Sequence, residues 1–295
     1  MPSITYPGGA PSIDQTTGAL TVSALLKAPT YLAKRVMPDT RQFLSQLLFR
    51  PATTASGAVV YNVDRAEDAY PARGDSQVVE PGGEFPMIDF TGGADRVAVA
   101  EKIGAGYIVT DEARDRNELD VMVRGNQLVR NTLIRQDAAR ALAAFNRDVP
   151  TVNATAPWTT AKAMRRDVVS AVAQIKNTRL GYAANTVLIN PQTEADLLLL
   201  DELQNLAPRE DKNLNPLYSQ TLANYLGMQW VANEFVPQGQ AIVLQPGVTG
   251  KDVEEKPFRL SVVREGTRER DVVIASRRSV PVVDAPLSAV VIKGV

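Results

Sequence analysis

The stretch TDEARDRNELDVMVRGNQLVRNTLIRQDAARALAAF, residues 110–145, decides the fold. Thr110 is a favourable N-cap, and Asp111 and Glu112 follow it at positions where the helix dipole favours anions. Most apolar residues of the stretch share one stripe at 100° per residue, and these are Leu119, Met122, Val123, Val129, Leu133, Ile134, Ala141 and Phe145. We therefore predict one helix over about 110–146, roughly 50 Å long, with a sheet beneath its stripe.

The composition excludes most catalytic chemistry. The 295 residues include no Cys and no His, which rules out disulfides, thiol nucleophiles, Ser-His-Asp relays and Cys/His zinc sites. Lys and Arg number 32 against 33 Asp and Glu, for a net charge of −1, so the chain as a whole has no basic footprint. We expect no cofactor and no metal. A hydrolase that uses carboxylates alone stays open.

The N-terminal segment carries no signal for export or for a membrane. It reads MPSITYPGGAPSID, without a cationic start or a continuous apolar stretch. The longest aliphatic cluster, residues 197–200, is far shorter than the ~20 residues that cross a bilayer. Residues 1–50 are predicted to form an extended arm with one or two short helical pieces, because Pro29 and Pro38 interrupt its apolar patterns.

Residues 51–94 are predicted to form an extended loop. Val59, Tyr61 and Val63 alternate with other residues at the period of a strand, and the apolar run 85–90 is its expected hairpin partner. The long polar stretch between them is typical of a functional loop. Because a two-stranded hairpin is only marginally stable in water, we expect this one to lie on another copy of the chain.

The second half alternates helices with short strands, which favours a mixed helix-and-strand lobe. A strand at 97–103 precedes the long helix. The elements predicted after Pro150 are helices at 160–178, 190–206 and 217–226, strands at 186–189, 228–231, 241–244, 258–263 and 271–275, and a polar break at 245–257.

No cluster of residues forms a catalytic pattern. The acid-rich segment 111–120 also contains Arg114 and Arg116, and the start of a helix explains its acids. Ile103-Gly104-Ala105-Gly106 lacks the third glycine of a dinucleotide site, and no P-loop motif occurs.

The order of these pieces, together with three local stretches, resembles the major capsid proteins of tailed bacteriophages. The stretches are Thr186 to Pro191 followed by Glu194 to Leu198, Leu226 to Ala241 with its Gly and Pro-Gly turns, and Arg277 to Pro286. The resemblance implies an α+β fold of the Hong Kong 97 type. It assigns residues 1–50 to the N-terminal arm, 51–94 to the extended loop, 95–148 with 272–295 to the peripheral domain and its spine helix, and 150–271 to the axial domain.

The resemblance also implies a function and a set of contacts. Such proteins assemble as hexamers and pentamers into an icosahedral head shell that encloses double-stranded DNA. The extended loop of one subunit is expected to rest across its neighbour's spine helix. The expected inter-subunit contacts are Val59, Tyr61, Val63, Arg65, Arg73, Phe85, Met87, Ile88 and Phe90. The implied partners are further copies, portal and scaffolding proteins, a cementing or decoration protein and the packaged DNA, with assembly in the host cytoplasm and no membrane.

Two departures from the family pattern limit these expectations. Some relatives join subunits through a loop lysine, but this chain has no Lys between Lys34 and Lys102, so we expect non-covalent joining. The arm before residue 51 is too short for a fused scaffold segment, so a separate scaffolding protein is expected. The alternative within the same fold is an encapsulin-type compartment that houses a cargo protein.

Overall fold

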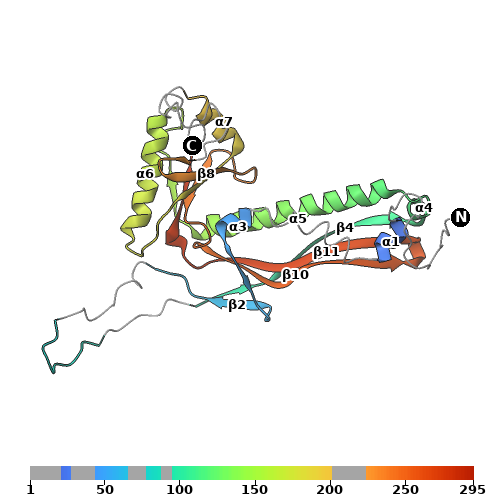
Figure 1. Ribbon diagram of the computed structural model, residues 1–295, viewed down its shortest axis with the longest axis horizontal. Coiled ribbons are helices and arrows are strands. Elements are labelled where there is room, and N and C mark those ends of the chain that lie inside the picture. The colour runs from blue at the N-terminus through green and yellow to red at the C-terminus, as the bar shows by residue number, and fades with distance from the viewer. Residues whose placement is uncertain (1–20, 28–43, 66–77, 88–94, 201–223) are drawn as a thin grey trace.

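The computed structural model describes residues 21–27, 44–65, 78–87, 95–200 and 224–295. Its chain forms an angular body around two main sheets, and a two-stranded sheet lies at the base of the extended loop (Figure 1). A long arm, built from helix α5 (Leu119–Asp148) lying along a sheet, meets an upright lobe that carries α6 (Ala161–Asn177) and α7 (Pro191–Leu198). The base of the extended loop lies near the corner between the arm and the lobe, and its described residues 78–87 lie away from both.

The arm contains a four-stranded sheet in the order β1-β10-β11-β4. Strand β1 runs parallel to β10, and the other neighbours are antiparallel. The strands are β1 (Arg50–Thr53), β4 (Glu101–Thr110), β10 (Gly250–Glu265) and β11 (Arg270–Val283), with η2 (Gly266–Arg268) at the β10–β11 turn. The predicted polar break at 245–257 is therefore wrong from Gly250 onward. Pairing with β11 holds this polar stretch in a strand, with register shifts around Lys256 beside Pro257.

The spine is one short and one long helix, α4 (Asp111–Asp115) and α5 (Leu119–Asp148). Thr110 caps α4 as predicted, because its hydroxyl accepts the N–H of Ala113 at 3.3 Å. The predicted single helix is wrong at Asn117, which adopts a left-handed φ of 54°. The Asn117 side chain accepts the N–H of Val22 at 2.8 Å, which attaches helix α1 (Val22–Lys27) to this corner.

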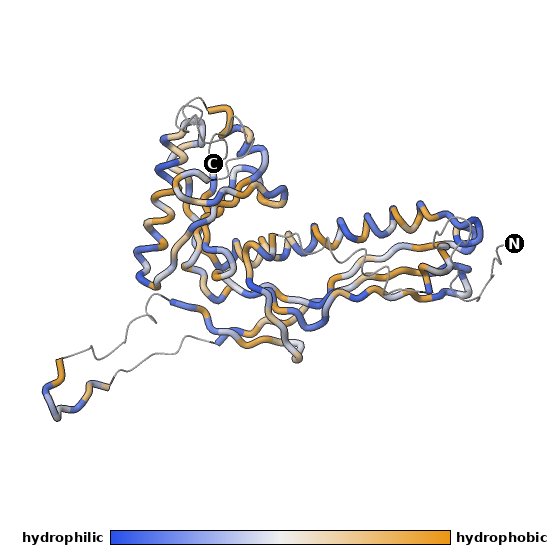
Figure 2. Tube along the Cα trace, viewed as in Figure 1, coloured by the Kyte–Doolittle hydropathy of each residue, from blue (hydrophilic) through white to orange (hydrophobic). Residues whose placement is uncertain are grey.

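The apolar stripe of α5 lies on the sheet, as expected. Its buried members Met122, Val129 and Leu133 pack against the inner face of β4, β10 and β11. Farther along the helix, Ala141 and Phe145 pack against α3 (Leu44–Leu48) and the sheet of the lobe. Figure 2 shows hydrophobic and hydrophilic residues alternating along this helix. Val123 was assigned to the stripe but is 59% exposed.

The lobe contains a six-stranded sheet in the order β5-β12-β9-β6-β8-β7. One face packs against α6 and α7, and the other against α3 and the end of α5. The strands are β5 (Thr151–Asn153), β6 (Thr186–Ile189), β7 (Asn224–Tyr225), β8 (Met228–Ala232), β9 (Gln240–Leu244) and β12 (Ala289–Lys293), and the helices are α3 (Leu44–Leu48), α6 (Ala161–Asn177), α7 (Pro191–Leu198) and η3 (Pro286–Ser288).

Most predicted elements of the lobe are confirmed, with two corrections. Helix α7 ends at Leu198, and residues 201–206 lie outside the described part of the chain. Residues 217–223 of the helix predicted at 217–226 also lie outside it, but Asn224–Tyr225 is strand β7. Leu226 and Gly227 both have positive φ, so the chain turns there into β8.

Two strands join a different sheet from the one that the expected domain boundaries imply. Strand β10 falls within residues 150–271, expected in the axial domain, but joins the four-stranded sheet. Strand β12 falls within 272–295, expected in the peripheral domain, but joins the six-stranded sheet. The chain crosses between the sheets after Val283, so the long β10–β11 hairpin belongs to one sheet and the final strand to the other.

Gly125 of α5 provides a test of this packing. A Cβ at this position would lie 2.6 Å from Cγ of Tyr107 on β4. Gly125→Ala should therefore lower the free energy of unfolding by about 1–2 kcal/mol, because overpacking outweighs the better helix propensity of alanine. Urea unfolding of the unassembled chain measures the change.

The matched control for Gly125 is the same substitution in a Tyr107→Ala background. There the ring is absent, and Gly125→Ala should stabilise the chain by about 0.5–1 kcal/mol. Stabilisation of equal size in both backgrounds would show that α5 does not lie against Tyr107.

Candidate assembly interface

The extended loop begins and ends in a two-stranded hairpin. Strand β2 (Ala58–Tyr61) pairs antiparallel with β3 (Arg96–Val99), so that Val60 faces Val97 across the ladder. The predicted partner at 85–90 is wrong for its described part, because residues 85–87 form no strand. Residues 96–99 pair instead because β3 leads directly into β4 and brings the chain back beside β2.

One face of this hairpin is apolar and turned to solvent. Val60, Val97 and Val99 are 65%, 66% and 64% exposed, and Ala58 is also exposed. The register places these four side chains together on one face. We call Ala58, Val60, Val97 and Val99 the valine face.

The predicted contact residues of β2 lie on the opposite face. Val59 and Tyr61 are half-buried against their own subunit, and so is Val63 farther along the loop. Arg65 is exposed. The predicted alternation of β2 is present, but both faces of the strand are apolar, so the sequence pattern does not distinguish the valine face.

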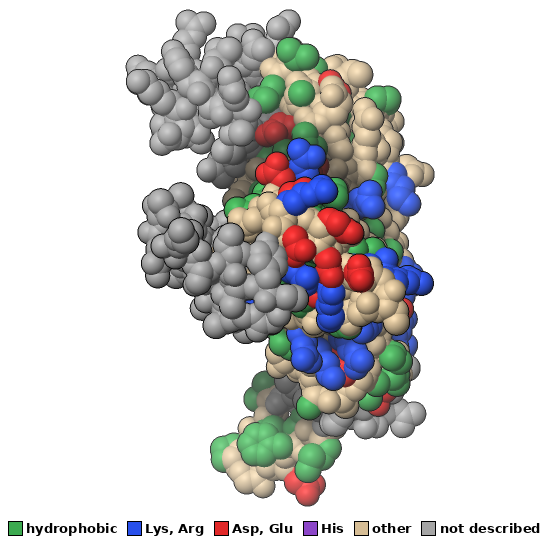
Figure 3. Space-filling model, turned by 90° about the vertical axis from the view of Figure 1, so that its right-hand side faces the viewer, with side chains coloured by type: hydrophobic (Ala, Val, Ile, Leu, Met, Phe, Trp, Pro, Cys, Tyr) green, Lys and Arg blue, Asp and Glu red, His purple; other side chains and the backbone are tan. Residues whose placement is uncertain are grey.

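The described far part of the loop, residues 78–87, is called the tip segment. It turns at Pro81-Gly82, where Gly82 has a φ of 88° and Gly83 donates its N–H to the Glu80 carbonyl at 2.8 Å. Phe85 and Met87 are 79% and 91% exposed. Hydrophobic side chains cover this segment at the bottom of Figure 3. Of the other predicted contacts, Arg73, Ile88 and Phe90 lie outside the described residues.

A second partly apolar surface lies on the four-stranded sheet, on the side opposite α5. Register places Ile108, Val272 and Val263 in one row across β4, β11 and β10, and Ile274 in the next row. Ile108 and Val263 are 45% and 47% exposed. No described helix covers this surface. We call Ile108, Val263, Val272 and Ile274 the open sheet face.

Cations border one end of the open sheet face. Lys102, Arg278 and Lys256 are register partners across the three strands, and Arg259 follows on β10. Arg278 is paired with Glu255 at 3.1 Å, whereas Lys102, Lys256 and Arg259 are exposed. The tip segment carries the opposite charge, because Glu80 and Glu84 are its only charged residues.

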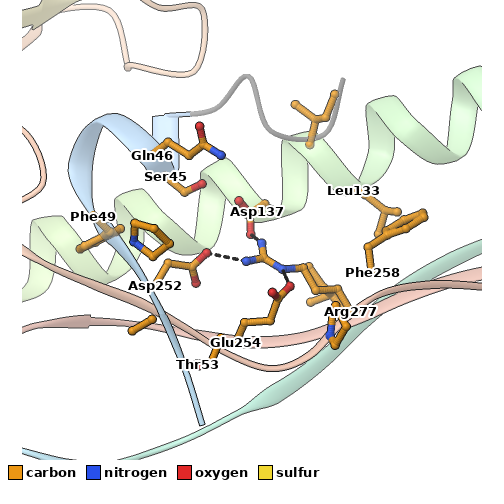
Figure 4. A pocket seen from close by; sticks show the side chains of 15 residues that line it. Ser45, Gln46, Phe49, Thr53, Leu133, Asp137, Asp252, Glu254, Phe258 and Arg277 are labelled. Carbon is orange, nitrogen blue, oxygen red and sulfur yellow. Dashed lines mark hydrogen bonds and ion pairs between the residues drawn. The ribbon is translucent and has the colours of Figure 1, made fainter. Parts of the chain in front are cut away.

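A partly buried charge cluster joins α5 to the sheet (Figure 4). The guanidinium of Arg277 on β11 donates to Asp252 at 2.7 Å, to Glu254 at 2.8 Å and to Asp137 of α5 at 3.1 Å. The cluster lines a cavity of about 480 Å³ beneath α3 and α5. Burial raises the pKa of Asp137, and its attraction to Arg277 only partly opposes this shift. Burial alone would lower the pKa of Arg277, but the attraction of Asp252 and Asp137 raises it.

Charges at the far end of the arm are also neutralised within the chain. Arg264 binds Asp111, and Arg114 binds Asp271 at 3.1 Å. The hydrogen bond from Arg264 lowers the pKa of Asp111. Figure 3 shows this end, where acidic and basic side chains are mixed. These pairs stabilise the corner between α4 and the β10–β11 turn.

The described residues show neither a metal site nor a membrane span. Among them, no group of three or more acidic side chains is arranged to hold a metal ion. None of the described helices combines the length and apolarity that a membrane span requires.

Solved structures share this architecture. The virus-like particle from Pyrococcus furiosus has 12% identity and a TM-score of 0.59, with 90% of this chain and 98% of that chain covered. The capsid protein of the cyanophage P-SCSP1u has 13% identity and a TM-score of 0.59, with 85% and 88% covered. The phage G major capsid protein, solved with decoration proteins, has 8% identity and a TM-score of 0.57, with 86% and 90% covered. No curated protein matches the chain.

These similarities define the fold as the Hong Kong 97 type, which confirms the predicted α+β class. A family model described as phage capsid protein matches residues 93–292. The chain belongs to this family of phage capsid proteins. It is a structural protein of the phage head shell, a major capsid protein, and not an enzyme.

The Arg277 cluster gives a stability prediction. Arg277→Met leaves three carboxylates without their shared cation, so the free energy of unfolding should fall by about 3 kcal/mol at pH 7. The deficit should shrink as the pH falls, because burial raises the pKa of Asp137, and once this carboxylate takes up a proton it loses less by the absence of the cation. Thermal and urea unfolding at pH 7 and below measure the deficit.

The neighbouring Arg278 is the control. It is paired with Glu255 alone, and its side chain is 38% exposed, so Arg278→Met should cost less than about 1 kcal/mol. Equal losses in both variants would show that the three-carboxylate cluster does not hold α5 in place.

Proposed function

We propose that this chain assembles as hexamers and pentamers into a closed icosahedral shell, in which the extended loop of each subunit lies on its neighbour. The observation that carries this proposal is the valine face, which is apolar and two-thirds exposed in the single chain. Burying the three valines supplies about 3–6 kcal/mol per contact. Closed symmetry also covers the strand edges that a monomer leaves open.

The open sheet face is our proposed receiving surface on the neighbour. It combines an apolar row with the exposed cations Lys102, Lys256 and Arg259, which match the acidic, apolar tip segment. The outer side of α5 is a less suitable receiving surface, because its exposed apolar residues Val123 and Leu128 are separated by polar residues. We therefore place the loop on the sheet of the neighbouring arm, instead of across the spine helix that the family resemblance suggested.

The proposed partners follow from the same assembly. Portal, scaffolding and decoration proteins and the packaged double-stranded DNA complete a phage head, and the shell assembles in the host cytoplasm before it becomes part of the virion. An encapsulin-type compartment shares the fold. The family match to phage capsid proteins favours the head shell, and the contents of purified particles, DNA or a cargo protein, distinguish the two.

A charged substitution on the valine face tests the loop contact. Val60→Asp combined with Val97→Asp should abolish particles, because each contact would bury carboxylates without partners. The variant should keep the wild-type circular dichroism and melting temperature, since both side chains face solvent in the single chain. Size-exclusion chromatography and negative-stain microscopy measure assembly.

Val169→Asp is the matched control. Val169 of α6 is 53% exposed but lies outside the loop. This variant should assemble like the wild type. Normal particles from the Val60/Val97 variant, or loss of particles from both variants, would contradict the role of the valine face.

The absence of loop lysine predicts how the subunits are joined. Particles boiled in SDS should give a single band at the 31.9 kDa of the chain, because no lysine lies between Lys34 and Lys102 to form an amide link. A ladder of linked subunits that resists boiling would overturn non-covalent joining.

A further inference from the structure

Asp64 attaches the extended loop to the place where the two sheets meet. Its N–H donates to the carbonyl of Asp284 at 2.7 Å, and its carboxylate accepts the hydroxyl of Tyr182 at 2.8 Å. Asp284 lies where the chain passes from β11 to β12, and Tyr182 lies in the connection between α6 and β6. Burial, followed by the bond to Asp64, raises the pKa of Tyr182, so the hydroxyl stays a donor.

Asp284 is itself held in place. Its Oδ2 accepts Arg50 at 2.8 Å and Lys251 at 3.1 Å, and its side chain is 13% exposed. Arg50 opens β1 and Lys251 lies at the start of β10, so two separate segments bind this carboxylate. Asp64 therefore binds a fixed point on the body of the subunit.

The second strand of the hairpin has its own polar attachment. Arg96 of β3 contacts Asp148 at the end of α5 at 3.3 Å. The loop is thus attached to both sides of the corner, through Asp64 on one strand and Arg96 on the other. Since the tip segment is largely exposed, the contacts that hold the loop on its subunit lie at the base, and these two polar contacts are among them.

We propose that Asp64 and Tyr182 are positioning residues, which set the direction in which the extended loop leaves its subunit and thereby the angle between neighbouring subunits. The part about subunit angles rests on the proposed shell function. The attachment itself does not, because it lies within one chain. A hydroxyl–carboxylate bond is directional, and its position at the base means that a small rotation there displaces the whole loop.

Hydrogen exchange on the unassembled chain tests the attachment. Tyr182→Phe and Asp64→Ala should each speed exchange of the amides at 61–65 by about tenfold, since each removes a hydrogen bond to a charged group. The double variant should exchange no faster than Asp64→Ala, because both changes remove the same contact. Asp64→Asn keeps an acceptor oxygen and should restore most of the protection. Wild-type exchange in Tyr182→Phe would overturn the proposal.

Particle diameter tests the effect on assembly. Tyr182→Phe and Asp64→Ala should broaden the distribution of shell diameters in electron micrographs, and Asp64→Asn should narrow it again. Tyr225→Phe is the control, because the Tyr225 hydroxyl bonds Arg165, away from the loop. Shells of one wild-type diameter from all variants would refute the positioning role. If the wild type forms no shells, the proposed function fails, and the exchange experiment still decides the attachment.

Discussion

No described part of the chain covers the valine face. The proposed assembly depends on the exposure of this apolar surface. The register of β2 and β3 places Ala58, Val60, Val97 and Val99 on one side of a ribbon only two strands thick. A ribbon of this kind needs a further layer to be stable in water. In the assembly that we propose, a neighbouring subunit supplies that layer.

The remaining structure forms a firm support for this contact. Helix α5 is held to its sheet by an apolar stripe and by the Arg277 cluster, in which one cation binds three carboxylates. At the far end of the arm, Arg264 and Arg114 are paired with Asp111 and Asp271 of the same chain. The exposed cations beside the open sheet face, Lys102, Lys256 and Arg259, are therefore the group that we assign to the neighbour's tip segment.

Features that depend on a local pattern of residues were predicted correctly from the sequence. Features that depend on contacts between distant segments were not. The apolar stripe and the Thr110 cap of the spine were predicted from the sequence. The break at Asn117 was not, because the side chain of Asn117 binds Val22 of α1, a residue far away in the sequence. The hairpin partner was misassigned because 85–90 and 96–99 are both apolar. The start of β10 was not predicted as a strand because it contains the charged residues Lys251, Asp252 and Glu254. Lys251 binds Asp284, which follows β11, and the two carboxylates bind Arg277 of β11. The alternating pattern predicted strand β2, but it did not show which face of the strand is exposed to solvent.

Because the chain has no cysteine, an engineered pair reports the proposed loop contact most directly. Val60→Cys places a thiol on the valine face, and Val263→Cys places one on the open sheet face. Particles of the double variant, oxidised and analysed by non-reducing SDS gel, should give disulfide-linked multimers, while each single variant should stay largely monomeric on the gel. Intact particles whose double variant runs only as a monomer would contradict the account.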